Sequence, residues 1–346
     1  MTHYRSPKSR PRIIMVSKIN LRYPPDDSTR QLTFHLPSIT NPKFFISLLR
    51  NAWRANTASV LFISNPQKED LLLISLVKTL YKTRLKVLVF DLIMQSAGPR
   101  SNQLLMRIKR KLLRAIDVFI FIHKDTSGYE QSYDIPRSRC QYVPFKANNF
   151  DLADKITTND GDYVVALGAS QRDYRLLVDA IGGSSIPLKI VLPESRAKVH
   201  GATIGYKCLP KNVEHVSTPV DRLTWNRYIG ESRLVVIPIF PGVIQPAGIS
   251  VYLEAMALGK PVVITKGAST EGLLHADLAV IVPAGDVQAL RNAIHWVWSD
   301  DTMRKKLSEN GRRYALSLGD HARLLADLRS VIDRQCPRRL SSQSSQ

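Results

Sequence analysis

Three features are scarce in this chain of 346 residues: cysteines, acidic residues and long apolar runs. The cysteines are Cys140, Cys208 and Cys336, and none stands in a CxxC or histidine-linked spacing. This usage predicts a reducing compartment and no structural zinc. No apolar run approaches the roughly 18 residues that a membrane-spanning helix needs. The first residues are polar and basic, without the apolar core of a signal peptide.

Motifs of several enzyme classes are absent as well. The sequence has no P-loop, no HExxH, no ordered Ser/His/Asp set and no spaced DxD. The two acidic pairs, at 26–27 and 300–301, are adjacent rather than spaced and fall in expected loops. We therefore expect neither a catalytic metal nor a cofactor.

The scarcity of acidic residues gives a formal net charge of +20, and this charge is uneven. Residues 1–115 hold 21 Lys and Arg against 5 Asp and Glu, which leaves a net charge of only +4 for the other 231 residues. A one-sided positive field attracts a polyanion or an anionic membrane surface. The chain has no RNP, zinc-finger or helix-turn-helix signature. We therefore predict an anionic membrane as a partner and no nucleic acid, with salt-dependent RNA binding as the test of the opposite.

The densest basic segment is RIKRKLLR at 107–114. If residues 104–114 form a helix, its apolar stripe consists of Leu104, Leu105, Ile108 and Leu112. The flanks and the opposite side carry Arg107, Arg110, Lys111 and Arg114. Two interpretations stay open: a solvated surface helix that covers a sheet, and a helix that rests on anionic lipid headgroups.

Short apolar, β-branched runs alternate with helical stretches along the chain. The first half has such runs at 12–17, 59–64, 86–91, 117–122 and 140–144. The second half has them at 163–168, 188–192, 213–217, 233–238, 261–265 and 278–283. This alternation predicts an α/β protein with parallel sheets, and the two sets predict two Rossmann-like, doubly wound domains.

A polar region at 146–161 separates the two sets and is expected to link the domains. We place the N-terminal domain at 12–150 and the C-terminal domain at 160–315, followed by a terminal helix at 316–335. The basic tail 1–11 and the Ser/Gln-rich tail 336–346 are expected to be disordered.

The segment 248–265, GISVYLEAMALGKPVVIT, predicts a helix, a glycine stop and a buried strand. Gly259 suits the left-handed end of a helix, and Pro261 cannot continue it. Glu254 stands in an apolar run, where a carboxylate needs a partner or a purpose. From spacing alone, a Glu that points to water at a helix end is an equally good interpretation.

This segment resembles the donor-site helix of retaining GT-B glycosyltransferases of family 4 (glycosyl transferases group 1). Their pattern is roughly EGFGL-x-x-LEAMA-x-GKPVV, and LEAMALGKPVV matches its second part. The resemblance implies the GT-B fold, with a donor cleft between two domains and a last helix that crosses back onto the first. It also implies that Glu254 binds the ribose hydroxyls of a nucleotide-sugar, with Gly248, Ile249 and Ser250 as further donor-binding residues.

The chain departs from the family before this helix. The family's first Glu, eight positions before the second, usually contacts the transferred sugar, and that position is Pro246 here. The neighbouring Gln245 is our candidate for a neutral contact. Gly248 stands one place earlier than the family's second Gly.

Residues 163–181 predict a strand, a glycine turn and a helix. Gly168 forms the turn, Ser170 and Asp173 fit a capping box, and the free N–H groups of such a helix start bind phosphate. The family has Arg and Lys in this turn, beside the donor diphosphate. Here Arg172 stands without a matching Lys, and we name Arg172 as a catalytic candidate. An ordinary βα turn is the competing interpretation.

His123 and Asp91 each follow an apolar run, at the carboxyl end of a predicted strand, where doubly wound sheets carry functional groups. Some retaining GT-B enzymes have a His near the acceptor in this region, so His123 is our second catalytic candidate. In the family the strand at 213–216 approaches the base, which makes Val213 a binding candidate; His215 is interpreted as packed or exposed. Residues 18–22 replace the family's Gly-rich acceptor loop.

The resemblance and the charge together predict a glycosyltransferase that uses a nucleotide-sugar as substrate. It would transfer the sugar, with retention, to a lipid-linked or polysaccharide acceptor, in the cytoplasm at the inner face of a membrane. The donor diphosphate would help to activate the acceptor, so catalysis would consist mostly of positioning and leaving-group stabilisation. The alternative is a non-catalytic GT-B protein that binds a nucleotide or a partner, which Pro246 and the missing Lys motivate.

Overall fold

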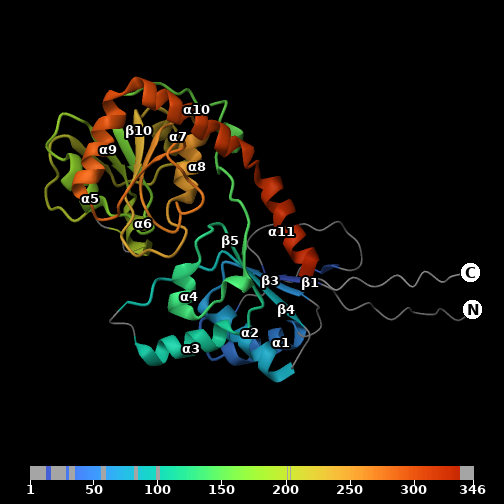
Figure 1. The fold of residues 1–346 in the computed structure, drawn as a ribbon. Coiled ribbons are helices and arrows are strands. Elements are labelled where there is room, and N and C mark those ends of the chain that lie inside the picture. The colour runs from blue at the N-terminus through green and yellow to red at the C-terminus, as the bar shows by residue number, and fades with distance from the viewer. Residues whose placement is uncertain are drawn as a thin grey trace, which may run out of the picture.

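The chain folds into two α/β units, each built on a six-stranded parallel sheet (Figure 1). The computed structural model describes residues 13–16, 29–30, 36–55, 60–81, 85–98, 102–200, 202 and 204–335. The predicted tails 1–11 and 336–346, and the expected acceptor loop at 18–22, lie outside the described residues.

The sheet of the N-terminal unit has the strand order β2-β1-β3-β4-β5-β6. Its strands are β1 (Ile13–Val16), β2 (Thr29–Arg30), β3 (Val60–Ser64), β4 (Lys86–Phe90), β5 (Val118–Phe121) and β6 (Cys140–Tyr142). Its helices are α1 (Phe44–Ala55), α2 (Lys68–Tyr81), α3 (Gln103–Leu113), α4 (Ser127–Tyr133) and the 3-10 turn η1 (Arg137–Arg139). Five of these strands lie within the predicted runs, whereas β2, two residues long, does not.

The sheet of the C-terminal unit has the order β12-β11-β10-β7-β8-β9. Its strands, all within predicted runs, are β7 (Val164–Leu167), β8 (Leu188–Val191), β9 (Val213–Val216), β10 (Leu234–Ile237), β11 (Val262–Thr265) and β12 (Val280–Val282). Counted from β7, this is the order of Rossmann sheets, which reverses between the first and fourth strands. The switch point, where such sheets bind ligands, therefore lies between β7 and β10.

The helices of the second half complete both units. They are α5 (Tyr174–Ile181), α6 (Glu194–His200), α7 (Arg222–Gly230), α8 (Ile249–Ala257), α9 (Val287–Ser299), α10 (Asp301–Ser317) and α11 (His321–Gln335). A 3-10 turn, η2 (Phe150–Leu152), lies in the region that connects the two sheets.

The central strands β3, β4 and β5 of the N-terminal sheet are buried on both faces, because alternate residues of a strand point to opposite sides and nearly all of theirs are buried. Leu61 and Ile63 of β3 belong to the apolar cluster that includes residues of α1, α2 and α3. Val60 and Phe62 belong to a second cluster, which extends into the C-terminal unit. The helices α1 to α3 therefore cover one face of the sheet.

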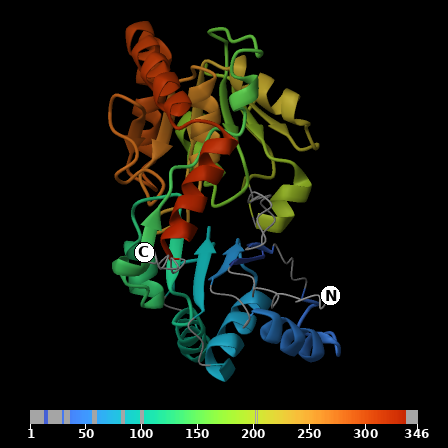
Figure 2. The same cartoon turned by 90° about the vertical axis from the view of Figure 1, so that its right-hand side faces the viewer.

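The last helix covers the other face. Leu324, Leu328, Val331 and Ile332 of α11 are buried in the same cluster as Val60 of β3. Their spacing of four, three and one places them on one side of the helix. Figure 2 shows α11 descending in red from the C-terminal unit to the sheet of the N-terminal unit. One apolar core thus runs through both units.

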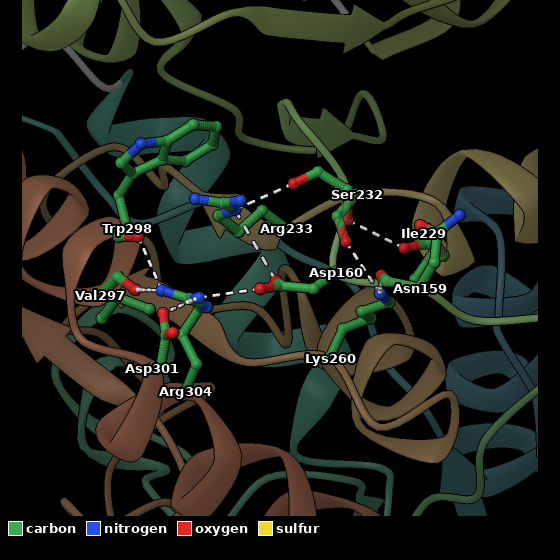
Figure 3. Close-up of polar contacts among 11 residues, drawn as sticks. Asn159, Asp160, Ile229, Ser232, Arg233, Lys260, Val297, Trp298, Asp301 and Arg304 are labelled. Atoms are coloured by element: carbon green, nitrogen blue, oxygen red, sulfur yellow. Dashed lines mark hydrogen bonds and ion pairs between the residues drawn. The ribbon is translucent and has the colours of Figure 1, made fainter.

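A buried polar network joins the connecting region to the C-terminal unit (Figure 3). Arg304 of α10 is 6% exposed and donates to the backbone carbonyl oxygens of Val297 and Trp298, at 3.1 and 2.6 Å. It also pairs with Asp160 at 2.8 Å. Lys260 donates to the carbonyl oxygen of Ser232 at 2.8 Å and to that of Asn159. These contacts fix the end of the connecting region to the C-terminal sheet.

Candidate functional site

A cleft of about 420 Å³ lies between the two units. From the N-terminal unit it is lined by Ser96 and Asp125, which lie in the segments after β4 and β5. From the C-terminal unit it is lined by Ile244, in the loop from β10 to α8, and by Lys266, directly after β11. Because doubly wound sheets bind ligands at the carboxyl ends of their strands, this cleft is the site that the fold favours.

The two walls of the cleft touch at Gly128 of α4. A Cβ atom on Gly128 would lie 2.1 Å from Cγ2 of Ile244, closer than any real side-chain contact. Ile244 is 9% exposed and belongs to the apolar cluster of the N-terminal unit. A glycine is therefore needed at this point for the β10–α8 loop to approach α4.

The loop after β7 borders the switch point and begins with Gly168, whose φ of 97° favours glycine. Asp173 caps α5, because its carboxylate accepts a hydrogen bond from a backbone N–H of the first turn at 3.0 Å. The capping box predicted to begin at Ser170 is therefore wrong. An antiparallel bridge between Arg172 and Ile239 holds the loop to the segment after β10, so the helix begins later than the sequence predicts.

Arg172, a predicted catalytic residue, is 3% exposed. Its guanidinium donates to the carbonyl oxygen of Leu167 at 3.2 Å and to that of Ser170 at 2.8 Å. The side chain thus supports the backbone of the loop next to the switch point. A contact between Arg172 and a diphosphate stays a prediction, and it requires the guanidinium to leave these two carbonyls.

The start of α8 follows the loop that lines the cleft. Gly248 precedes the helix with a φ of 96°, and a Cβ atom there would lie 3.0 Å from Cγ2 of Ile237. Glycine thus lets α8 begin against β10. Ile249 and Gln245 are buried, whereas Ser250 is half-buried. The first N–H groups of a helix have no intrahelical partner and attract anions.

Glu254 lies four residues further along α8 than Ser250 and is 8% exposed, so it does not point to water. Nε1 of Trp225, on α7, donates to Glu254 Oε2 at 2.9 Å. Burial raises the pKa of Glu254, while hydrogen bonds from Trp225 and Asn148 and the charge of Lys146 lower it. The carboxylate is therefore held in place beside the connecting region, with polar and cationic neighbours.

Asn149 is a residue of this region that the sequence analysis assigned only to a polar linker. It is 1% exposed, and its Nδ2 donates to the backbone oxygen of Glu254 at 3.1 Å and to Asn226 Oδ1 at 2.6 Å. Trp225 was not singled out either. A tryptophan one turn after the N-cap Asp221 is a sequence signal for a contact, but it does not name the partner.

Val213 does not lie at the candidate site. It is the first residue of β9 and pairs with Leu188, the first residue of β8, so it lies at the amino end of the sheet. Val213 is level with Val164 of β7, and Gly168 follows the carboxyl end of β7, four residues or about 13 Å further along. The prediction of Val213 as a nucleotide contact is corrected on this ground. His215, in the same strand, packs with its Nε2 3.0 Å from the carbonyl oxygen of Leu192.

His123 is fully buried just after β5, with its ring 5.0 Å from that of Phe121 and 5.8 Å from that of Tyr129. Neither ring nitrogen has a hydrogen-bond partner among the described residues. Burial lowers the pKa of His123 to about 4, against the smaller opposing effect of Asp125. The imidazole is therefore neutral at pH 7.

Asp91 follows β4 in a left-handed conformation, with a φ of 55°, which Asp tolerates. Burial raises its pKa to about 6. Its Oδ1 is buried and has no hydrogen-bond partner in the described part of the chain. Asp91 and His123 thus each follow the carboxyl end of a strand, as the sequence predicts, and the structure shows that these two strands are neighbours.

Two kinds of feature are absent from the described residues. No group of three or more His, Cys, Asp or Glu side chains has the arrangement of a metal site. No described helix combines the length and the apolar character that crossing a bilayer requires.

Residues 220–314 match the family model described as glycosyl transferases group 1. The match includes α7, α8, α9 and most of α10, and with them Gln245, Gly248, Ile249, Ser250 and Glu254. It does not extend to Gly168, Ser170, Arg172 or His123. No curated protein matches the chain.

Solved structures resemble nearly the whole chain. A glycosyltransferase from Rickettsia africae ESF-5 has a TM-score of 0.63 at 13% identity, over 89% of this chain and 86% of that one. Anabaena Alr3699/HepE in complex with UDP and glucose has a TM-score of 0.63 at 15% identity, over 89% and 87%. Sucrose-phosphate synthase from Thermosynechococcus elongatus has a TM-score of 0.63 at 15% identity, over 93% and 88%.

The fold is GT-B. The predicted α/β architecture with two Rossmann-like units is thereby confirmed. The family match and the structural matches together indicate a transferase. Membership of family 4 and retention of configuration stay predictions, as do the roles of the individual site residues.

Proposed function

We propose that this GT-B protein transfers a sugar from a nucleotide-sugar to a lipid-linked or polysaccharide acceptor, with retention of configuration. The observation that carries the proposal is the buried carboxylate of Glu254, which Trp225 holds within the segment that the family model matches. One structural relative, Anabaena Alr3699/HepE, is known in complex with UDP-glucose, which supports this class of donor.

In this proposal, Glu254 accepts hydrogen bonds from the ribose hydroxyls. The diphosphate binds between the turn at Gly168 and the start of α8, where backbone N–H groups and the helix dipole favour negative charge. Ser170 and Ser250 supply hydroxyl donors there. The same groups stabilise the charge that develops on the leaving diphosphate, which is where electrostatic catalysis has its largest effect.

The N-terminal unit provides the acceptor side of the cleft. A contact between the acceptor and His123 requires the fully buried imidazole to become exposed; at pH 7 this ring is neutral and has one N–H donor and one acceptor nitrogen. Gln245 stands beside Pro246, where the family's sugar-binding Glu is missing, and presents a neutral amide to the transferred sugar. We also propose that the protein works in the cytoplasm, at the inner face of a membrane.

The test starts with thermal unfolding in the presence of UDP-, GDP- and ADP-sugars. A ligand at 100 times its Kd stabilises the folded state by about 2.7 kcal/mol, which corresponds to a rise in Tm of roughly 5–10 °C for a domain of this size. The sugar-nucleotide that gives this rise is then tested for hydrolysis and transfer, with NMR of the anomeric proton to establish retention. No stabilisation by any of the three would refute the donor assignment.

A non-catalytic nucleotide-binding protein is the second candidate. Pro246 and the engagement of Arg172 with backbone carbonyls favour it. Stabilisation by a nucleotide-sugar without hydrolysis or transfer would establish this candidate. The Arg172→Ala variant separates two roles of that residue: a greater loss for the nucleoside diphosphate than for the nucleoside means phosphate contact, and equal losses mean loop support.

A further inference from the structure

Helix α1 has two apolar sides, and one of them faces outward. Phe44, Leu48 and Ala52 pack against the sheet. The outward side is formed by positions one or two residues later in each turn, and its large apolar members are Phe45, Ile46, Leu49 and Trp53. Ile46 is 71% exposed and Trp53 is 62% exposed. The outward side of a helix on a water-facing surface is normally polar, so this stripe implies a partner.

Helix α3 is built in the same way. Met106 and Leu113 are buried against the domain, whereas Leu104, Leu105 and Ile108 are 67%, 50% and 47% exposed. Three of the four residues of the predicted apolar stripe are therefore turned outward, whereas the fourth, Leu112, is half-buried against the core. A solvated helix covering a sheet would bury that stripe instead.

The charges around the two stripes have one sign. Neither α1 nor α3 contains an acidic residue. The exposed basic side chains next to the stripes are Lys43, Arg50, Arg107, Lys111 and Arg114. Arg110 is turned away from this surface, because its guanidinium donates to the carbonyl oxygen of Ser132 at 3.2 Å and pairs with Asp134 at 3.6 Å.

The two stripes belong to one layer. Helix α2 contacts both α1 and α3, and the three helices lie side by side along the lower edge of Figure 1, away from the C-terminal unit. Leu80 of α2 adds a further exposed apolar side chain. The layer covers the face of the sheet opposite to α11, so the surface does not overlap the donor side of the molecule.

We propose that the outward surface of α1 and α3 docks onto an anionic lipid bilayer. The apolar stripes enter the boundary between headgroups and acyl chains, and the basic side chains contact lipid phosphates. Amphipathic helices with Trp, Leu and Phe on one side and Lys or Arg beside them bind membranes in this way. A folded protein partner would have to match two apolar stripes with an entirely basic rim, whereas an anionic bilayer supplies both apolar depth and negative charge.

This docking deepens the proposed function, since a protein on a bilayer is placed to use a lipid-linked acceptor. It does not depend on transfer activity. Vesicle binding and donor binding are therefore measured separately, and the failure of one is distinguishable from the failure of the other.

The experiment is co-sedimentation of the full chain with vesicles of phosphatidylcholine alone or mixed with phosphatidylglycerol. We expect binding to the mixed vesicles that salt weakens, because exposed charges are screened over about 8–10 Å at physiological ionic strength. Two triple variants separate the apolar and the electrostatic contribution to vesicle binding. The apolar variant replaces Ile46, Leu49 and Trp53 together with Gln, which removes apolar contacts and is a good helix former. The charge variant replaces Arg107, Lys111 and Arg114 together with Gln and so removes three positive charges.

The expected effect of the charge variant is about a 100-fold loss of partitioning, because each cation near the surface contributes about fivefold. The apolar variant is expected to lose at least about tenfold. Matched controls in the C-terminal unit are Trp296→Gln, which removes an exposed aromatic, and the triple change Arg196, Lys211 and Lys305→Gln, which removes the same charge. Both controls are expected to bind as the parent does.

Insertion of α1 is tested with lipids brominated on the acyl chains. Quenching of tryptophan fluorescence is expected in the parent and is expected to disappear in Trp53→Phe, which keeps an aromatic ring and therefore vesicle binding. Circular dichroism and donor-induced thermal shift confirm that each variant is folded. Equal losses in the charge variant and its control, or quenching that persists in Trp53→Phe, would overturn the proposal.

Discussion

Replacing Glu254 is the sharpest test of the donor site. The carboxylate is 8% exposed and Trp225 occupies one of its oxygens, so other acceptor positions are available to a ligand. A hydrogen bond to a charged group contributes about 1.5–3 kcal/mol. Glu254→Ala is therefore expected to raise the Kd of the nucleoside diphosphate by about 10- to 150-fold. Isothermal titration calorimetry measures this directly.

The Gln variant refines the assignment. Glu254→Gln keeps an oxygen that accepts from Trp225 and from ribose, but without the charge, so a smaller loss of about 1 kcal/mol is expected. Burial raises the pKa of Glu254, so the folded state disfavours the ionised form, and stability falls as pH rises above 4.5. The Gln change removes that cost, so it is expected not to destabilise the protein at pH 7.

Two controls make the result interpretable. Glu309→Ala, at an exposed position of α10, removes a carboxylate far from the site and is expected to leave the Kd unchanged. A 2′-deoxynucleotide lacks one of the hydroxyls, so Glu254→Ala is expected to cost it less than the ribonucleotide. If folded Glu254→Ala binds the nucleotide as tightly as the parent, the reasoning about Glu254 is refuted.

Three further predictions concern packing and titration. Gly128→Ala is expected to destabilise the protein by about 1–3 kcal/mol through the clash with Cγ2 and Cβ of Ile244, and this cost should shrink in a denaturant-unfolding double-mutant cycle with Ile244→Gly, which removes both atoms. Burial raises the pKa of Asp91 from 3.8 to about 6. The folded state therefore loses stability as pH rises through this range, because the buried carboxyl group has to ionise. Asp91→Asn is therefore expected to stabilise by about 1–3 kcal/mol at pH 7 and by nothing below pH 4, and equal stability of parent and variant at both pH values would contradict this. Arg304→Ala leaves two backbone carbonyls unpaired (Figure 3) and is expected to cost about 2–4 kcal/mol, with a loss below about 1 kcal/mol as the contrary result.

The fold was predictable because parallel strands buried on both faces are continuous apolar runs. The runs at 60–64 and 262–265 have every residue buried; the first is apolar up to its last residue, Ser64, and the second consists of β-branched residues only. The strand β2 has two residues and no such run, so nothing in its composition distinguishes it. Glu254 was found through the motif around it rather than through its own surroundings.

The start of α5 shows what local sequence leaves undecided. Ser170 and Asp173 are both good N-caps, three residues apart, and propensity does not choose between them. The bridge between Arg172 and Ile239 favours Asp173 as the N-cap, because it holds Arg172 outside the helix. Asn149 is a similar case, because a pair of asparagines in a linker is usually solvated, and only the approach of α7 and α8 buries it.

The orientation of α1 and α3 was beyond sequence analysis for a related reason. Both helices carry apolar residues on more than one side, so the helical period does not identify the side that meets the sheet. Packing against the sheet determines which side of α1 is buried. Leu61 and Ile63 of the sheet belong to the same apolar cluster as Phe44 and Leu48, whereas Ile46 and Trp53 remain exposed. Packing against the sheet therefore explains one apolar side of each helix and not the other. An apolar stripe that the fold does not use requires an explanation outside the fold, and the uniformly basic residues beside it favour an anionic bilayer.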